Sequence, residues 1–425
     1  MIRAIISTGI GRLHLVQTAV AVKRAGVAVR LITGWVPSPR WRGLANMFGR
    51  LVGRPNLYER LATRRGGGAL ENAELRSCAL GEVLAVLTLR LVPRPWLAWW
   101  PRWDWLSFGR ASRRHLRDAD VFHVRSGAGQ GGAITRAREQ GMSVVVDQSA
   151  GHPAFMERQL RDEFARYGLP FRLGPSDPLW RLVLQDCADA DVLLANSAHV
   201  RDTFVAEGYP PERIAVIYLG VREDFLRLKN DYACPGPLRL LFTGNFGVLK
   251  GAHYLLPALQ RLDEAGVDYC LTVVGTNAEA PRLLREFPVR GEVRLVGHVL
   301  QDRLKGYLTD SDIYVFPSLS EGCASACMEA LAAGLPVVTT RESGVPVTDG
   351  RDGLLVPAKD ATALAAGIMR LAGDEALRAE LGRAGARLIA EGYTWDEYGR
   401  QLAALYGRLR SGSGNGEKPE GKEVG

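Results

Sequence analysis

The chain has 425 residues and a formal net charge of +8, and 47% of its residues are hydrophobic. This length exceeds one ordinary hydrophobic core, so we expect two domains of about 150–250 residues each. No window offers about 20 uninterrupted apolar residues, and the opening run MIRAIIST is too short for a signal peptide, so we expect a cytoplasmic protein without a membrane-spanning helix.

The cysteine pattern argues against both a disulfide framework and a metal centre. Six cysteines are scattered along the chain. Cys323 and Cys327 have CxxxC spacing, but no second Cys or His pair stands nearby at ligand spacing. We therefore expect a reducing compartment and no metal site.

The first strand is followed by a glycine-rich turn. Residues 4–7 read as a strand, Gly9 and Gly11 as a tight turn, and the following apolar pattern as a helix that ends at Gly26 before a strand at 27–33. This order is typical of one half of a doubly wound sheet. A glycine-rich first turn lets the backbone approach a phosphate, although a tight turn without a ligand has the same pattern.

A basic, tryptophan-rich stretch interrupts this pattern. Residues 40–117 hold 15 Arg and 5 acidic residues, a local charge of +10. Tryptophans and arginines are interleaved in 90–117, which suits the headgroup layer of an anionic membrane surface. The alternatives are tryptophans that pack on the domain core beside solvated arginines, and single-stranded nucleic acid as a partner. No nucleic-acid-binding fold accompanies the stretch, so we expect no nucleic-acid partner.

Regular α/β order returns after residue 120. Asp147 ends a strand and His152 follows five residues later, at the strand end where ligands of parallel sheets gather. A structural role is the other interpretation of such a histidine. Residues 222–237 lose periodicity and end in Pro-Gly-Pro, so we expect the interdomain linker there.

The second half repeats the βα order and centres on residues 311–340, which read as strand, loop, helix and strand. Ser325 is the expected cap of the helix. Glu321 and Glu329, with seven residues between them, flank a helix start that attracts anions. A nucleotide-sugar donor needs cations and backbone donors for its diphosphate, which Lys250 and this helix start can supply. It also needs carboxylates for its hydroxyl groups, which the two glutamates can supply.

Five segments together carry a resemblance to a known family over about 235–395. They are GNFGVLKG, LTVVG, VRLVGHV, the whole of 311–340 and DGLLVP. Together they resemble the donor-binding half of family 4 glycosyltransferases of GT-B fold; GIGRLHLVQTAVAVKRAGVAV, ADVLLANSAHVRDTF and IAVIYLGV match more loosely. The resemblance implies an α/β protein with two Rossmann-like doubly wound domains that face a cleft. The expected parts are an acceptor-side domain at 1–222 with a returning helix at 395–410, a linker at 223–237, a nucleotide-sugar-binding domain at 238–394 and a disordered tail at 411–425.

The resemblance also assigns roles on the donor side. It implies that Lys250 contacts the donor diphosphate, that Glu321 holds the transferred sugar and that Glu329 holds the ribose. Val299 would lie against the base. The backbone of three residues at the helix start would cap the phosphates: Ala324, Ser325 and Ala326.

Some positions depart from the family pattern. Asn245 stands where the family usually has an arginine, which removes one cation from the phosphate site, and Arg12 is a possible substitute. Cys323 and Ala324 replace the usual residues after the first glutamate. On the acceptor side, where the family commonly has a histidine at the strand end, either Asp147 or His152 could serve. From that side the turn of Gly9 and Gly11 would approach the phosphates.

The implied activity is a retaining, metal-independent, hexosyltransferase-type reaction without a cofactor. A sugar would move from a nucleotide-sugar donor to a glycan or lipid-linked acceptor in the polysaccharide biosynthesis of the cell envelope, peripherally on the inner face of the membrane. The alternatives are a GT-B-like nucleotide-sugar epimerase, a phosphorylase, and a non-catalytic protein that binds nucleotide sugars or membranes. Fold alone does not decide between these activities.

Overall fold

The computed structural model describes residues 1–10, 14–36, 39–51, 56–78 and 100–412. The chain divides into two compact units, each described by itself below. Unit 1 comprises Met1–Gln148, Ser176–Leu194 and Tyr398–Gly425, and unit 2 comprises Ser149–Pro175 and Ala195–Glu397. Compared with the boundaries expected from the sequence, unit 2 also takes in 149–175 and 195–222.

The first sheet has seven strands in the order β3-β2-β1-β4-β5-β6-β7, and the pairs β1–β2, β1–β4, β2–β3 and β4–β5 are parallel. Its strands are β1 Arg3–Ser7, β2 Ala28–Thr33, β3 Leu75–Ser77, β4 Val121–Arg125, β5 Ser143–Gln148, β6 Val192–Ala195 and β7 Ile214–Val216. The central strands are mostly apolar and are buried on both faces, as parallel sheets covered by helices require.

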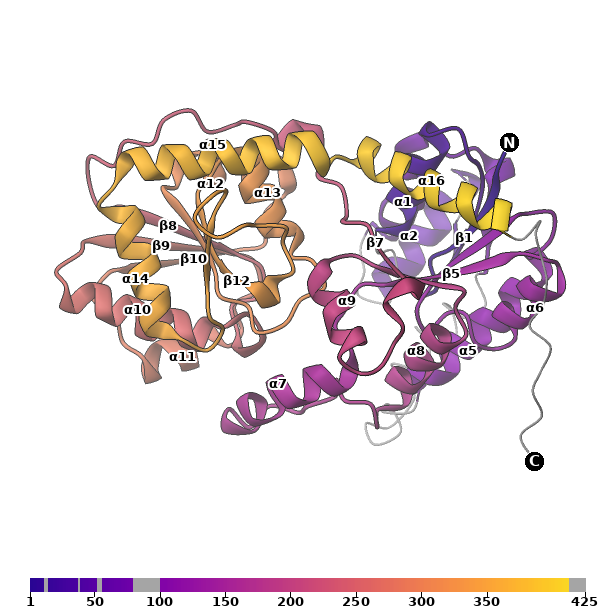
Figure 1. Ribbon diagram of the computed structural model, residues 1–425, viewed down its shortest axis with the longest axis horizontal. Helices are drawn as coiled ribbons and strands as arrows, with labels where there is room; N and C mark the ends of the chain where they lie inside the picture. Colours follow the sequence, from indigo (N-terminus) through magenta and orange to yellow (C-terminus); the bar gives the residue numbers. More distant parts are fainter. Residues whose placement is uncertain (11–13, 37–38, 52–55, 79–99, 413–425) are drawn as a thin grey trace. The chain divides into compact units, whose positions relative to one another are not determined.

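Helices cover both faces of the sheet in unit 1. The helix α1 is joined by α16, whose Gly399 lies against the backbone of Ala21, while α5, α6 and α8 lie together (Figure 1). The helices that carry residues of unit 1 are α1 Leu15–Arg24, α2 Arg42–Leu51, α3 Leu57–Ala62, α5 Trp100–Ser112, α6 Ala133–Glu139, α8 Pro178–Ala188 and α16 Trp395–Gly412. Short 3₁₀ helices lie at Pro39–Trp41, Thr63–Gly68, Asn72–Glu74 and Arg113–His115.

The second sheet lies in unit 2 and has six parallel strands in the order β10-β9-β8-β11-β12-β13. Its strands are β8 Leu238–Thr243, β9 Tyr269–Val274, β10 Glu292–Gly297, β11 Ile313–Phe316, β12 Val337–Thr340 and β13 Leu354–Val356. In both sheets the first strand lies inside the sheet, and the order of the strands reverses beside it. This is the doubly wound order. The expected pair of Rossmann-like α/β sheets is therefore confirmed.

The helices of unit 2 also lie on both faces of its sheet, with α12 and α13 on one side and α10 and α14 on the other (Figure 1). These helices are α7 Pro153–Arg166, α9 Ala198–Val205, α10 Ala252–Glu264, α11 Ala280–Glu286, α12 Gln301–Asp310, α13 Ser325–Ala333, α14 Ala361–Ala372 and α15 Glu375–Gly392. Short 3₁₀ helices lie at Pro211–Arg213, Glu223–Phe225, Val248–Lys250 and Arg341–Ser343.

The helix α13 is packed unusually tightly between the sheet and α15. It is apolar on almost every side, with Cys327, Met328 and 330–333 buried. Glycines of α15 permit the close approach: a Cβ at Gly382 would lie 2.3 Å from the carbonyl oxygen of Gly334. Dense packing on both sides holds α13 in one position.

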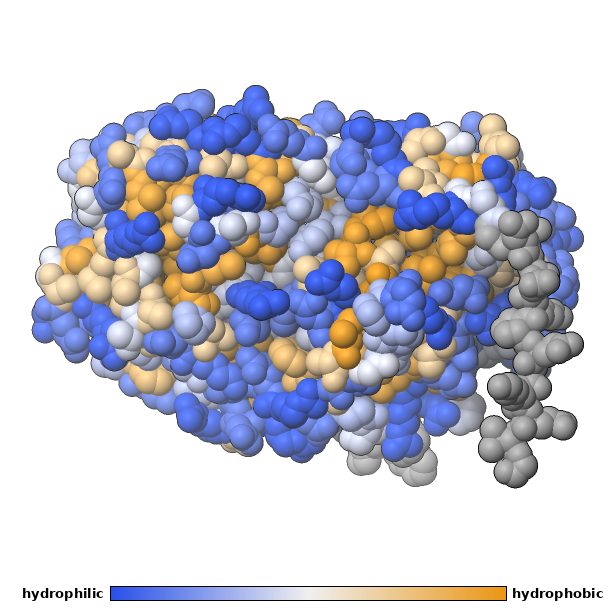
Figure 2. Space-filling view, viewed as in Figure 1, coloured by the Kyte–Doolittle hydropathy of each residue, from blue (hydrophilic) through white to orange (hydrophobic). Residues whose placement is uncertain are grey.

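Hydrophilic side chains dominate the outer rim of each unit, with smaller apolar areas between them (Figure 2). Among the described residues, no helix combines the length and apolar character needed to span a bilayer. The six cysteines are all unpaired.

Candidate functional site

Lys250 and Glu321 meet at the carboxyl ends of β8 and β11 in unit 2. Lys250 ends the 3₁₀ helix that follows β8, and its ammonium group forms an ion pair with the Glu321 carboxylate. The turn depends on Gly251, which has φ +72° and lies so close to Pro317 that a Cβ would meet its carbonyl oxygen at 2.0 Å. Both charged side chains are mostly buried, and burial lowers the pKa of Lys250 to about 8.

The loop that carries Glu321 is fixed by hydrogen bonds. The Glu321 N–H donates to the carbonyl of Glu342 at 2.8 Å, and the Ala324 N–H donates to the carbonyl of Ser343 at 2.9 Å. The Ser197 hydroxyl donates to the carbonyl of Gly322. A loop held at three successive points keeps the Glu321 carboxylate in a defined place.

The helix α13 points its amino end toward this loop. It begins at Ser325, and the N-cap is Ala324 without a side-chain cap, so the expected cap by Ser325 is wrong. Ser325 occupies the first helical turn instead, because the loop bonds of Ala324 fix the boundary one residue earlier. Within the described residues the N–H groups of Ser325 and Ala326 have no hydrogen-bond acceptor. Such free N–H groups and the helix dipole suit a phosphate.

Glu329 lies one turn further along α13. Burial raises the pKa of Glu329 to about 7; the nearby Arg222 lowers it and Asp224 raises it. No described residue donates a hydrogen bond to the Glu329 carboxylate or forms an ion pair with it. A half-buried carboxylate with free lone pairs is suited to accept hydrogen bonds from the hydroxyl groups of a ligand.

The remaining donor-side residues lie at the same edge of the sheet. Asn245 follows β8 and is exposed, while Val299 follows β10 and packs partly against the core. The carboxyl ends of the parallel strands share one edge, so both residues end up on the side of Glu321 and Lys250. Gly275, after β9, lies against the backbone of Gly244 in the same row of loops.

Asp147 is the centre of a buried polar network in unit 1. His14 Nε2 bonds to both carboxylate oxygens of Asp147, at 2.9 and 3.0 Å, and His123 Nε2 bonds at 3.3 Å. The Tyr406 hydroxyl and His123 Nδ1 lie 2.6 Å apart. Burial alone raises the pKa of Asp147, but the charge and hydrogen bonds of the two histidines lower it well below its usual range, so the carboxylate stays ionised.

His152 belongs to unit 2 and has a structural environment. Its Nδ1 accepts a hydrogen bond from the Ala154 N–H at 3.2 Å and thereby caps α7. The ring contacts Phe204 edge-on and Tyr209 in a tilted arrangement, and burial lowers its pKa. The His152 ring therefore caps α7 and packs in the core. Asp147, by contrast, contacts the titratable side chains of His14 and His123.

The glycine-rich turn is described only in part. Gly9 has φ +64°, and a Cβ there would collide with the ring of Trp105 at 2.4 Å. The Arg125 guanidinium donates to the carbonyl of Ile10 at 3.0 Å and stacks 4.6 Å from the Trp105 ring centre. Gly11 and Arg12 lie outside the described residues.

The described part of the tryptophan- and arginine-rich stretch holds one buried and one exposed tryptophan, Trp105 and Trp103. Trp105 is buried beside the glycine-rich turn, whereas Trp103 is 61% exposed. The part at 90–99 lies outside the described residues.

Sequence reasoning missed His14 and His123. His14 opens the helix after β1, and His123 lies inside β4. The available signal was their placement at strands that neighbour β5, but the pairing of β1 and β4 has to be known first. Within the described residues, no group of three or more His, Cys, Asp or Glu side chains is placed to hold a metal ion.

The two halves of the chain match two glycosyltransferase family models. Residues 12–225 match Glycosyltransferase Family 4, and residues 237–374 match Glycosyl transferases group 1. The chain belongs to glycosyltransferase family 4, and the resemblance drawn from the sequence is confirmed.

Named relatives include two proteins of bacterial polysaccharide synthesis. The chain is 34% identical over 200 residues to the amylovoran biosynthesis glycosyltransferase AmsK of Erwinia amylovora, covering 44% of this chain and 49% of the relative. It is 32% identical over 213 residues to the putative colanic acid biosynthesis glycosyltransferase WcaL of Salmonella typhimurium, covering 47% and 52%. These matches span about half the length of the relatives.

Solved structures share the fold at low sequence identity. Sucrose-phosphate synthase from Thermosynechococcus elongatus aligns with a TM-score of 0.69 and 18% identity, covering 96% of this chain and all of that one. HepE from Anabaena, in complex with UDP and glucose, aligns with a TM-score of 0.60 and 13% identity, covering 96% and 100%. The fold class is thus GT-B.

Proposed function

We propose that the protein is a retaining, metal-independent hexosyltransferase in cell-envelope polysaccharide biosynthesis. It transfers a sugar from a nucleotide-sugar donor to a glycan or lipid-linked acceptor. The observation that carries the proposal is the grouping of Lys250, Glu321 and the amino end of α13, followed by the unpartnered Glu329, at one edge of the second sheet. The polysaccharide context of the relatives named above supports the choice of pathway.

In this proposal the donor diphosphate lies against the amino end of α13. The N–H groups of Ser325 and Ala326 and the Lys250 ammonium neutralise the charge that grows on the departing diphosphate. The ribose hydroxyls bind Glu329, the transferred sugar binds Glu321, and Val299 lies against the base. Asn245 adds a polar contact but no charge to the phosphate site.

Retention of the anomeric configuration follows from attack on the same face from which the diphosphate leaves. The departing phosphate accepts the proton of the acceptor hydroxyl, so neither glutamate acts as a nucleophile. On the acceptor side we assign the role to Asp147 before His152, because the His152 ring is already bound to the Ala154 N–H.

The proposed cellular site is the inner face of the cell membrane. The exposed Trp103 and the basic character of 90–117 support contact with an anionic surface. Attachment there would bring the enzyme to lipid-linked acceptors.

A thermal-shift panel of nucleoside diphosphates and nucleotide sugars tests the donor assignment. A ligand that binds the native state at 100 times its Kd stabilises it by about 2.7 kcal/mol. We expect a rise in Tm with at least one nucleoside diphosphate for the parent and for Glu380→Ala, an exposed glutamate of α15. We expect no rise for Glu329→Ala. An equal rise for Glu329→Ala would contradict the assignment, and absence of any rise in the parent would contradict the proposed function.

A further inference from the structure

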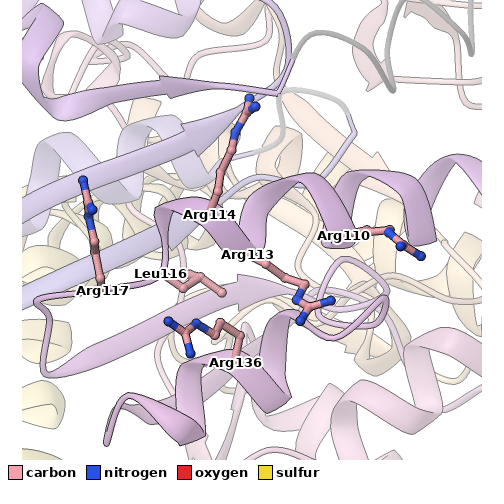
Figure 3. A pocket seen from close by; sticks show the side chains of 6 residues that line it. All are labelled: Arg110, Arg113, Arg114, Leu116, Arg117 and Arg136. Atoms are coloured by element: carbon pink, nitrogen blue, oxygen red, sulfur yellow. The ribbon is translucent and has the colours of Figure 1, made fainter.

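Unit 1 has a pocket of about 470 Å³ with a strongly basic lining (Figure 3). The lining residues are Arg110, Arg113, Arg114, Leu116, Arg117 and Arg136. Arg113 extends from the 3₁₀ helix Arg113–His115 that follows α5 and Arg136 extends from α6, and both approach the space around Leu116 (Figure 3). Two elements thus bring guanidinium groups to one hollow.

The positive charge of this arginine pocket is only partly compensated. Within the described residues, Arg110 and Arg113 form no ion pair. Arg136 lies 3.1 Å from Glu139, and Arg117 lies 4.0 Å from Asp118, in exposed pairs that contribute little. Like charges that are only partly paired with acidic groups repel one another, so an anion that binds between them is stabilised.

The arginine charges also act on the neighbouring His115. Burial, together with the charges of Arg114 and Arg76, lowers the pKa of His115 to about 4. The histidine is therefore neutral at physiological pH, and the arginines remain the cations of this surface.

The pocket extends along α6 toward the start of β4, and Asp147 is not among the residues that line it. Arg117 precedes the start of β4, and Arg136 lies near the end of α6, which leads back to the start of β5. Asp147 lies at the opposite, carboxyl end of these strands.

An exposed tryptophan stands on the same helix face as the pocket. Trp103 is 61% exposed and precedes Arg110 by seven residues, two helical turns, so both project from one side of α5. An indole beside guanidinium groups is the combination that settles in the headgroup layer of a bilayer. Binding of a small soluble anion does not require an exposed indole, so Trp103 favours a lipid as the ligand.

We propose that the arginine pocket binds the headgroup phosphate of an anionic phospholipid, with Trp103 inserted beside it in the headgroup layer. The planar guanidinium fork binds phosphate oxygens in pairs, which suits this ligand. The proposal deepens the membrane contact of the proposed function by naming its binding site, and it is independent of donor binding.

Vesicle flotation of the full chain tests the proposal. The vesicles contain phosphatidylcholine with or without phosphatidylglycerol. A basic residue near an anionic surface contributes about fivefold in affinity, so the double variant Arg113→Gln, Arg136→Gln should bind phosphatidylglycerol vesicles about 25-fold more weakly. The control Arg261→Gln, Arg285→Gln removes the same charge from exposed positions of unit 2 and should change binding less than about twofold. Trp103→Ala should weaken binding several-fold.

The possible outcomes separate the explanations. Equal loss in both double variants would mean that net charge alone governs binding and would overturn the pocket. Strong parental binding that both double variants retain would also overturn the pocket. Failure of the parent to float would overturn both the pocket and the membrane contact, while the nucleotide thermal shifts would still decide the donor site. A Tm rise with inorganic phosphate that only the pocket variant loses, without a loss of flotation, would assign the pocket to free phosphate and overturn the lipid ligand.

Discussion

The Lys250 ammonium is paired with the Glu321 carboxylate, 71 positions along the chain, across the ends of two neighbouring strands. The strand pairing β8–β11 brings these loops together, and the glycine at 251 allows the contact. The pair holds a cation that the proposed diphosphate needs, and it also positions the carboxylate proposed to hold the sugar.

Lys250→Ala should weaken the binding of the nucleoside diphosphate found in the thermal-shift panel. Loss of a hydrogen bond to a charged group removes about 1.5–3 kcal/mol, roughly 10- to 150-fold in Kd. Titration calorimetry measures the change. Arg261→Ala is the matched control because it removes an exposed cation of the same unit. Similar Kd values for the parent and Lys250→Ala would remove this residue from the donor site.

The affinity for the diphosphate should fall at both high and low pH, because one group loses its charge at each end. The pKa of Lys250 is lowered to about 8, so its charge is lost as the pH rises through this value. The pKa of Glu329 is raised to about 7, so its carboxylate is lost as the pH falls through this value. Affinity should therefore be highest between these limits. Glu329→Gln should abolish the acid limb and Lys250→Ala the alkaline limb; profiles unchanged in both variants would contradict the assignment.

Glu329→Gln should change the pH dependence of stability. The pKa of Glu329 is raised to about 7 in the folded state, above its ordinary value of 4.5, so the folded protein binds the proton more tightly. The stabilisation from the neutral carboxyl is lost as the pH rises through 7. At pH 8 the variant should therefore be more stable than the parent, by up to about 3 kcal/mol, and at pH 5 the difference should be small. Urea unfolding at both pH values measures it, and equal differences at both would contradict the raised pKa.

Asp147→Asn and His152→Ala should separate an acceptor role from a structural one. His152→Ala removes the α7 cap and should lower stability by about 1 kcal/mol. It should leave sugar transfer by the folded fraction unchanged. Asp147→Asn replaces an ionised partner of two histidines and should lower the transfer rate without changing the Kd for the nucleoside diphosphate. The reverse pattern of transfer rates would move the role to His152.

Gly382→Ala should be destabilising although alanine is the better helix former. Its Cβ would meet the carbonyl oxygen of Gly334 at 2.3 Å, so α13 and α15 would have to separate. Such overpacking lowers stability by about 1–3 kcal/mol. Gly392→Ala in the same helix has no atom within 4 Å of the added Cβ and should be neutral or slightly stabilising. Thermal unfolding of both variants measures the difference.

The fold of the second unit was largely readable from the sequence. Its strands are short apolar runs separated by helical patterns, so element type follows directly from periodicity. Glu321 and Glu329 could be placed at the carboxyl edge because consecutive βα elements fix that position. The helix boundary at Ser325 could not be predicted, because it depends on hydrogen bonds from a loop 19 residues later.

The polar network of the first unit was not readable in the same way. His14, His123 and Asp147 come from three separate elements, and their contact follows from the strand pairs β1–β4 and β4–β5. The sequence pattern gives no register between strands. The arginine pocket combines α5 and α6, so the basic run at 90–117 indicated its charge but not the contribution of Arg136.

A crystal structure of the protein with the nucleoside diphosphate selected by the thermal-shift panel tests the central claim most directly. The account predicts diphosphate oxygens at the N–H groups of Ser325 and Ala326 and at the Lys250 ammonium, with both ribose hydroxyls on Glu329. A nucleotide bound elsewhere, with Glu329 free of the ribose, would contradict the account.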